Sequence, residues 1–302
     1  MKDIIMYGAD WCKDCVKAKE ILLEKNINYI YLDITDTEKG QEYSEKVMEM
    51  NAQQLQSNYD ELISYIEKYI ESPRKEKVLD FYKQYEERLI VLPASHKAAY
   101  HSAFVGGYVY HVLNVIKNAI VSLDTWRRAG SNLEGITLDN VVFCALNHDL
   151  GKLGTKDEDA VYPSQDKWRK ENLGELYKFN TNLAYMTVPD RSLFLLQEAG
   201  IPISQDEYIA IKTHDGLYDE ANTPYFKSFI PENRFRTPLA LIIHEADMRA
   251  ARIEWEQQYL PTIGKGNLAK QNSKRTFNPN NNKSKALSSV KSAGLKNMLD
   301  NL

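Results

Sequence analysis

The chain has 302 residues, of which 43% are hydrophobic and 26% are charged, a balance typical of folded globular proteins and not of disordered chains. No apolar run approaches the 18 residues of a membrane-spanning helix, and no secretory signal pattern follows Met1. Three cysteines are too few for a disulfide scaffold. We therefore expect a cytoplasmic protein without a membrane partner.

The net charge of −4 is unevenly distributed along the chain. Residues 264–302 contain eight Lys or Arg and one Asp, so this end carries +7 and residues 1–263 carry −11. An acidic body binds nucleic acid poorly without specific contacts, whereas a basic tail can attach to a polyanion.

Residues 1–50 predict a β-α-β unit that carries a redox motif. Two short runs rich in Ile and Tyr, residues 4–7 and 28–34, are typical of strands and flank a helical segment that opens with Cys12 and Cys15. A cysteine at a helix N-terminus is favoured as the thiolate, and a second one nearby can resolve a mixed disulfide. Cys12 and Cys15 are candidate redox residues; the alternative is a structural remnant with inert thiols.

This segment resembles the start of a glutaredoxin in Met6-Tyr7-Gly8, Trp11-Cys12-Lys13-Asp14-Cys15 and Tyr31-Leu32-Asp33. The resemblance covers about 35 residues and implies a small thioredoxin-like fold. A complete glutaredoxin also has a Thr-Val-Pro loop and two further strands, and neither follows before residue 90. We therefore expect a truncated fold, and we interpret Thr187-Val188-Pro189 as unrelated.

Three further regions follow. Residues 51–90 have apolar residues at helical spacing and predict a helical connector, residues 91–262 predict an almost entirely helical main domain, and residues 263–302 predict a basic disordered tail. The predicted fold class is therefore mainly α, with an all-helical core and a small N-terminal βαβ piece. The tail ends with Leu295, Met298, Leu299 and Leu302 at the spacing of a short amphipathic helix, which either docks into a partner protein or frays.

All six histidines lie between residues 96 and 244. Imidazole and carboxylate groups are common ligands of divalent metals, so the context of each matters. A predicted helix over 138–150 ends in His148 and Asp149, and another over 205–213, which follows a capping box at Ser204, leads into His214. His111 begins a helix at the edge of its apolar stripe.

The most informative position is Asp247. The predicted helix over 239–260 has an apolar stripe, and Asp247 falls on it, with His244 on a neighbouring face. The stripe consists of Leu239, Ile242, Ile243, Ala246, Ala250 and Ile253. A carboxylate that points into a core requires a cation or a metal, and a buried arginine is the alternative partner.

Taken in order, His111, His148-Asp149 and Asp247 resemble the H…HD…D signature of the HD superfamily of metal-dependent phosphohydrolases. His148-Asp149-Leu150-Gly151-Lys152 is similar to its HD-x-GK motif, and His244-Glu245-Ala246-Asp247 to its H-x-A-D motif. The stretch from His101 to His111 is similar to the H-x-A-F-x-G-G-x-x-x-H pattern of bacterial HD-domain 3'–5' exoribonucleases and their relatives. The resemblance spans about 95–255.

The resemblance implies a helical core that holds one or two divalent ions, namely Mn, Mg, Co, Zn or Fe. The implied metal ligands are His111, His148, Asp149, His214, His244 and Asp247. It also implies hydrolysis of a phosphoester in a nucleotide or short nucleic acid, as in a nucleotidase, dNTPase or phosphodiesterase/exonuclease. Asp149, Lys152 and His101 are then the catalytic candidates: Lys152 would neutralise phosphate charge and His101 would contact the leaving group or a phosphate.

The chain also departs from this family. The relatives that process nucleic acid carry an oligonucleotide-binding barrel, and here a glutaredoxin-like piece and a connector take its place, so we do not expect processive action on long polymers. Residues 155–200, an insertion before His214, form either a substrate pocket or a solvated helical face.

Two other functions remain open from the sequence. The set of six ligands also resembles that of HD-fold proteins that use two irons to activate oxygen. Alternatively, the chain is a redox-linked accessory protein in which the thiols and the tail act and the HD core is structural. Bound iron with oxygen consumption would identify the first alternative, and activity that depends on Cys12 but not on Asp149 would identify the second.

Overall fold

The computed structural model describes residues 4–8, 29–33 and 50–262, and the chain divides into two compact units, Met1–Met50 and Asn51–Leu302. In the first unit, strands β1 (Ile4–Gly8) and β2 (Tyr29–Asp33) pair in parallel, with Ile4 opposite Tyr29. The two strands were predicted. The helix predicted between them, with Cys12 and Cys15, lies outside the described residues.

The second unit is mainly helical. Its α-helices are α3 (Ala52–Tyr69), α4 (Arg74–Gln84), α5 (Glu86–Val91), α6 (Gly107–Arg128), α7 (Leu138–Asn147), α8 (Lys167–Leu173), α9 (Val188–Glu198), α10 (Gln205–Lys212), α11 (Thr223–Phe226) and α12 (Leu239–Gln258). Short 3₁₀ turns η1 (Leu150–Leu153), η2 (Gly216–Tyr218), η3 (Glu220–Asn222), η4 (Pro231–Asn233) and η5 (Leu260–Thr262) join them. No helix in the described part of the chain is both long and apolar enough to cross a membrane.

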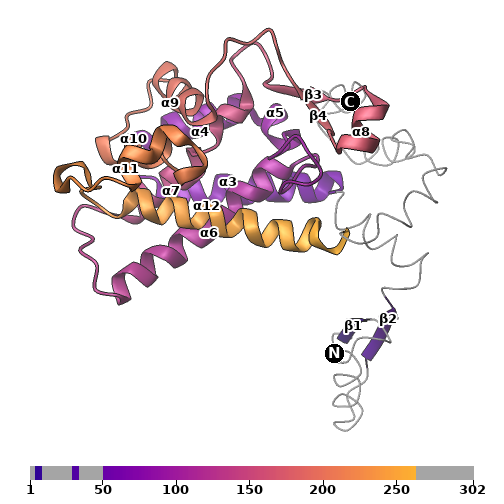
Figure 1. The fold of residues 1–302 in the computed structure, drawn as a ribbon, viewed down its shortest axis with the longest axis horizontal. Helices are drawn as coiled ribbons and strands as arrows, with labels where there is room; N and C mark the ends of the chain where they lie inside the picture. Colours follow the sequence, from indigo (N-terminus) through magenta and orange to yellow (C-terminus); the bar gives the residue numbers. More distant parts are fainter. Residues whose placement is uncertain (1–3, 9–28, 34–49, 263–302) are drawn as a thin grey trace. The chain divides into compact units, whose positions relative to one another are not determined.

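The centre of this unit is the pair α6 and α12, which run side by side, with α7 and α10 packed against them (Figure 1). The apolar stripe predicted for α6 is fully buried, as Val109, Val112 and Ile116 show. Burial of such a stripe contributes about 1.5–3 kcal/mol per large side chain. The candidate site residues His111, His148, Asp149 and His214 are buried within this packed core.

Residues 51–90 form α3, α4 and α5, which belong to the same compact unit as residues 91–262. α3 packs on α6 and α7, and α5 packs on α6. From α4, the buried Tyr82 hydroxyl donates to the carbonyl oxygen of Leu146 at 3.0 Å, at the end of α7. The segment that the sequence predicts as a connector thus supports the helix that leads into His148.

The sequence predicts an almost entirely helical main domain, but this domain also contains two short strands. Strands β3 (Val161–Pro163) and β4 (Tyr177–Phe179) form an antiparallel hairpin around α8, within the insertion at 155–200. Each strand has three residues, which is too short for an alternating pattern to be recognised in the sequence. The backbone N–H of Leu176 donates to the carbonyl of His96 at 2.9 Å, so the hairpin is fastened to the loop that precedes His101.

One detail of α12 also differs from the prediction. Ile253, predicted on the buried stripe, is 41% exposed, whereas Glu254 is 1% exposed. The residue that follows Ala250 on the buried face is Glu254, at i+4, and not Ile253, at i+3. Both spacings are compatible with one helix face, because an α-helix has 3.6 residues per turn.

A buried ion-pair network joins three of the helices. The Arg74 guanidinium of α4 donates to Glu207 of α10 at 2.7 Å and to Asp139 of α7, and it lies 4.0 Å above the ring of Phe143. Glu207 also completes the capping box with Ser204, as the sequence predicts. Burial would raise the pKa of Glu207, but the Ser204 amide, the Asn140 amide and Arg74 together lower it below its usual value.

We predict that Arg74→Ala lowers the free energy of unfolding by about 3–5 kcal/mol, because it leaves the buried Glu207 carboxylate without its cation. Urea denaturation measures this change. Arg128→Ala is the matched control: its ion pair with Asp124 lies on the surface, where such pairs contribute about 0–1 kcal/mol. Equal losses in the two variants would contradict the prediction.

We also predict a pH dependence of stability at Glu207. Because its pKa is lower in the folded protein than its ordinary value of 4.5, its stabilising contribution is complete above pH 4.5 and is lost as pH falls through the folded pKa. Glu207→Gln keeps a side chain suited to the capping box and cannot titrate. The stability difference between wild type and Glu207→Gln, measured by urea denaturation from pH 7 to pH 3, should therefore shrink at the acid end; a constant difference would refute this.

Candidate metal centre

The His148-Asp149 pair lies where α7 ends. The helix stops at Asn147, and the 3₁₀ turn η1 begins at Leu150. The Ser192 hydroxyl of α9 fixes this turn, since it accepts from the Gly151 N–H at 2.8 Å and donates to the His148 carbonyl at 3.0 Å. A Cβ at position 151 would meet the Val188 carbonyl oxygen at 2.2 Å, so only glycine allows α9 to approach this closely. The break in the helix lets two adjacent side chains reach one point.

Five of the predicted ligands meet in one buried cluster, although they are spread over residues 111–247. The His111 Nε2 lies 3.1 Å from Asp247 Oδ1 and 3.7 Å from Asp149 Oδ2. The His148 Nε2 lies 3.4 Å from Asp149 Oδ2 and 3.7 Å from Asp247 Oδ1, and the His214 Nε2 lies 3.6 Å from Asp149 Oδ1. Helices α6, α7, α10 and α12 bring these atoms together.

The spacing of these atoms fits a divalent metal ion. Two ligands that each lie about 2.1 Å from a shared ion, at angles of 90–109°, are about 3.0–3.4 Å apart. The separations within the cluster are close to this range. In addition, the Nε2 atoms of His111 and His148 are buried without a hydrogen-bond partner, which is costly unless a further group binds them. The groups His111–His148–Asp149 and His148–His214–Asp247 could each hold a metal ion.

Backbone carbonyls orient two of the imidazoles. The Nδ1 of His148 lies 2.8 Å from the carbonyl oxygen of Ala145, and the Nδ1 of His214 lies 2.8 Å from that of Ile211. A carbonyl oxygen only accepts, so Nδ1 carries the proton in each ring. When the ring is neutral, Nε2 then offers its lone pair to the centre of the cluster.

Charge compensation in the cluster is strong. Burial opposes the charged form of His111 and His214, but the neighbouring carboxylates outweigh it and raise the pKa of His111 to about 10 and that of His214 to about 9. Burial would raise the pKa of Asp149 and Asp247, but Lys152 and the imidazoles near Asp149, and the three histidines near Asp247, lower both. The carboxylates thus stay ionised and attract a cation.

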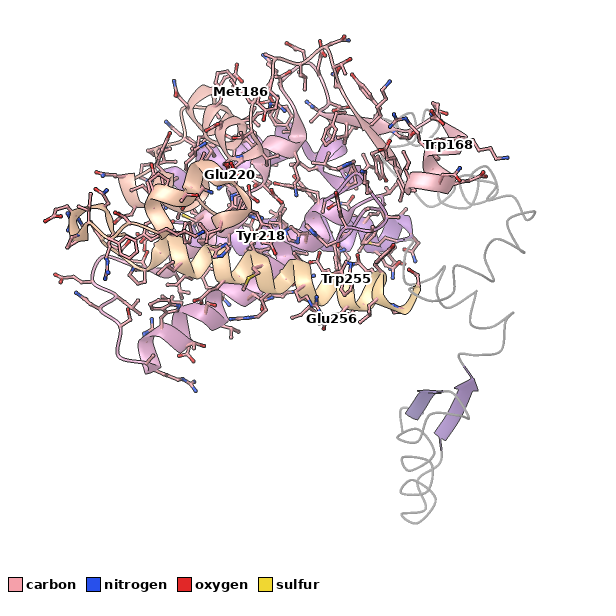
Figure 2. All side chains as sticks on the ribbon, viewed as in Figure 1. Trp168, Met186, Tyr218, Glu220, Trp255 and Glu256 are labelled. Carbon is pink, nitrogen blue, oxygen red and sulfur yellow. The ribbon has the colours of Figure 1, made fainter. Side chains whose placement is uncertain are left out.

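His244, a predicted ligand, occupies a different position. It is not a member of either group of possible metal ligands named above. Its Nδ1 lies 2.8 Å from the carbonyl oxygen of His214, and its ring packs edge-on against Phe226 with the ring centroids 5.4 Å apart. Gly216 makes room for this ring: its φ is +57°, and a Cβ there would lie 2.2 Å from the imidazole. Tyr218, two residues later, is 87% exposed (Figure 2).

The two other catalytic candidates border the cluster. The Lys152 Nζ donates to Asp149 Oδ2 at 2.5 Å, and the Lys152 side chain is 22% exposed, so it reaches both the cluster and solvent. The His101 ring lies 4.5 Å from that of His111. Burial, with a smaller contribution from His111 and Lys152, lowers the pKa of His101 to about 3, so this imidazole is neutral at pH 7.

Sequence reasoning missed Glu254, whose carboxylate lies 3.1 Å from the His111 Nδ1. A signal was present: Glu254 is seven residues beyond Asp247 on the same helix, and residues separated by seven share a face. Asp247 itself faces the cluster as predicted, and its neighbours are histidines and not a buried arginine.

Comparisons with known proteins bear on the N-terminal part of the chain. The glutaredoxin family model matches residues 4–55, which include Cys12, Cys15 and the first turn of α3. No curated protein matches the chain. No solved structure matches it. The two cysteines and the C-terminal residues Leu295–Leu302 lie outside the described residues.

We predict that Zn²⁺ or Mn²⁺ added to chelator-treated protein raises the melting temperature by about 5–10 °C at a hundredfold excess over the dissociation constant. Asp247→Asn should abolish this shift, because it removes a charged ligand from the cluster. Asp124→Asn, at the far end of α6 and 46% exposed at its side chain, is the control and should keep it. Differential scanning calorimetry measures the shift, and an equal shift in Asp247→Asn would place the metal elsewhere.

Proposed function

We propose that the chain is a metal-dependent phosphohydrolase of the HD type that acts on a phosphoester of a nucleotide or a short nucleic acid. The observation that supports this most directly is that His111, His148, Asp149 and Asp247, the four residues of the H…HD…D motif, meet in one buried cluster with donor atoms at metal-ligand spacing. A bound metal ion would also satisfy the Nε2 atoms of His111 and His148, which are buried without a hydrogen-bond partner.

His111, His148, Asp149 and Asp247 would hold the ion, and His214 adds a further nitrogen beside Asp149. When bound, a divalent ion in such a site lowers the pKa of a coordinated water and polarises a phosphoryl oxygen. Both oxygens of Asp149 are near imidazoles, Oδ2 near His111 and His148 and Oδ1 near His214. This favours a bridging role for Asp149 if two ions bind.

Lys152 is suited to neutralise phosphate charge. Its ammonium bonds to Asp149 and is partly exposed, and its pKa is raised because Asp149 and Asp247 outweigh the effect of burial. A lysine that stays charged can stabilise the additional negative charge that develops on a phosphoryl group in the transition state.

His101 is suited to a contact with the substrate. Its Nε2 is buried and has no hydrogen-bond partner, and the ring is neutral at pH 7. A neutral imidazole is able to donate from one nitrogen and accept at the other, so it can bind a phosphate oxygen or a leaving group without adding a fixed charge.

The glutaredoxin match supports a second activity, which is thiol–disulfide exchange by Cys12 and Cys15 in the N-terminal unit. This activity would be independent of the metal cluster. Cys12→Ser should abolish the reduction of a small mixed disulfide without altering phosphoester hydrolysis, and retained reduction would exclude Cys12 as the attacking thiol.

We predict that the full chain, supplied with Mn, Co, Mg, Zn or Fe, releases phosphate or nucleotide from at least one member of a panel of dNTPs, NTPs, nucleoside monophosphates and short single strands. Asp149→Ala should reduce the rate about 100-fold or more, because it removes a ligand from the metal centre. Asp124→Ala should leave it unchanged.

Metal binding without hydrolysis across the whole panel would contradict the phosphohydrolase assignment. Oxygen consumption by protein that binds two irons would instead support the oxygenase alternative. If the chain binds no metal but catalyses thiol–disulfide exchange, the accessory-protein alternative would be supported.

A further inference from the structure

Glu254 is a buried carboxylate that is not among the predicted ligands. It lies on α12 seven residues beyond Asp247 and is 1% exposed. Glu256, two residues further on, is on the outer face of the helix and pairs with Arg252 at 2.8 Å (Figure 2). Because an ionised carboxylate in a core is costly unless it is paired and hydrogen-bonded, the partners of Glu254 indicate what it does.

Three donors surround this carboxylate. Its Oε1 accepts from the Asn114 amide at 2.8 Å, and its Oε2 accepts from the Ser102 hydroxyl at 2.7 Å. Both oxygens lie within 3.2 Å of the His111 Nδ1. Each oxygen is therefore held by one neutral donor, and the plane of the carboxylate is fixed with its two oxygens facing the imidazole N–H.

The position of His111 within its helix explains why it needs such a partner. His148 and His214 follow the ends of α7 and α10, where last-turn carbonyls have no helical N–H and accept from Nδ1 instead. His111 is the fifth residue of α6, and the carbonyls of the preceding turn are engaged by helical N–H groups. The acceptor for its ring must therefore come from another helix.

We propose that Glu254 is a positioning residue for the metal centre: it holds the Nδ1–H of His111 so that Nε2 faces Asp149 and Asp247, in position to bind a metal ion. This inference rests on the metal centre of the proposed function and adds the group that orients one of its ligands. Carboxylates in this role strengthen metal binding, and their loss commonly costs 10–100-fold in affinity.

The same carboxylate also restrains the loop that carries His101. Ser102 has a φ of +48°, a backbone conformation that residues other than glycine rarely adopt. Its N–H donates to the Gln258 side chain of α12 at 2.7 Å, and its hydroxyl donates to Glu254. These two contacts keep the His101 ring against that of His111. Glu254 thus holds both histidines from one point on α12.

Glu254→Gln tests the charge with little change in shape. The amide oxygen can take the place of Oε1 and accept from Asn114 and His111, and the amide NH₂ can donate to Ser102, whose hydroxyl is free to rotate. Glu245→Gln is the matched control, because Glu245 lies on the same helix. It accepts from the Trp126 indole at 3.0 Å and from the Ser122 hydroxyl, both on α6, and neither partner belongs to the metal cluster.

The affinity of the full chain for Zn²⁺ is measured by competition with a chelator, alongside the melting temperature of each metal-free variant. We expect Glu254→Gln to weaken zinc binding about 10–100-fold, with a metal-free melting temperature close to that of Glu245→Gln, and we expect Glu245→Gln to bind zinc as wild type does. Equal zinc affinity in Glu254→Gln and wild type would overturn the inference.

A second measurement does not depend on any variant. Nitrogen NMR of the zinc-loaded wild type, labelled at histidine, should show His111 protonated at Nδ1 and bound to zinc through Nε2; zinc on Nδ1 would overturn the inference. Absence of zinc binding by the wild type would overturn the metal centre and this inference together. Normal zinc binding that is insensitive to Glu254→Gln would overturn this inference alone.

Discussion

The constraint on which the second unit depends is that two carboxylates lie within its helical core, the buried Asp149 and the partly buried Asp247. An unpaired charge there would cost several kcal/mol. Both residues stay ionised because Lys152 pairs with Asp149 and because imidazoles from α6, from the end of α7 and from the end of α10 surround the two carboxylates. Helices α6, α7, α10 and α12 therefore have to meet at one point and in one relative arrangement. Apolar packing alone would tolerate several arrangements of these helices; the polar cluster does not.

Hydrogen bonds outside the cluster keep its atoms in place. The helix ends supply carbonyls to His148 and His214, Glu254 supplies a carboxylate to His111, and Ser192 ties the turn at Gly151 to α9. These contacts use backbone groups and side chains that are themselves buried, so they restrict each ring to one orientation. A site in which the supporting groups are this well fixed binds a ligand with little loss of conformational freedom.

Local patterns in the sequence predicted the helices, and the resemblance to the H…HD…D signature predicted most of the residues of the cluster. The stripe on α6 and the position of Asp247 on α12 follow from helical periodicity, and both are confirmed. The hairpin β3–β4 was not predicted, since its strands are too short to show a period. Glu254 and the place of His244 depend on how helices pack, on single glycines such as Gly216, and on which carbonyls are free, which one-dimensional patterns do not contain.

The order of the chain has a consequence for the newly synthesised protein. His111, His148 and His214 leave the ribosome before α12, which carries Asp247 and Glu254. Until α12 has been made and has docked, the partial chain lacks one carboxylate of the cluster and the group that orients His111. At typical rates of synthesis the residues between His214 and Asp247 take about 2–7 s to add, so assembly of the whole cluster is coupled to completion of the fold and not to its early stages.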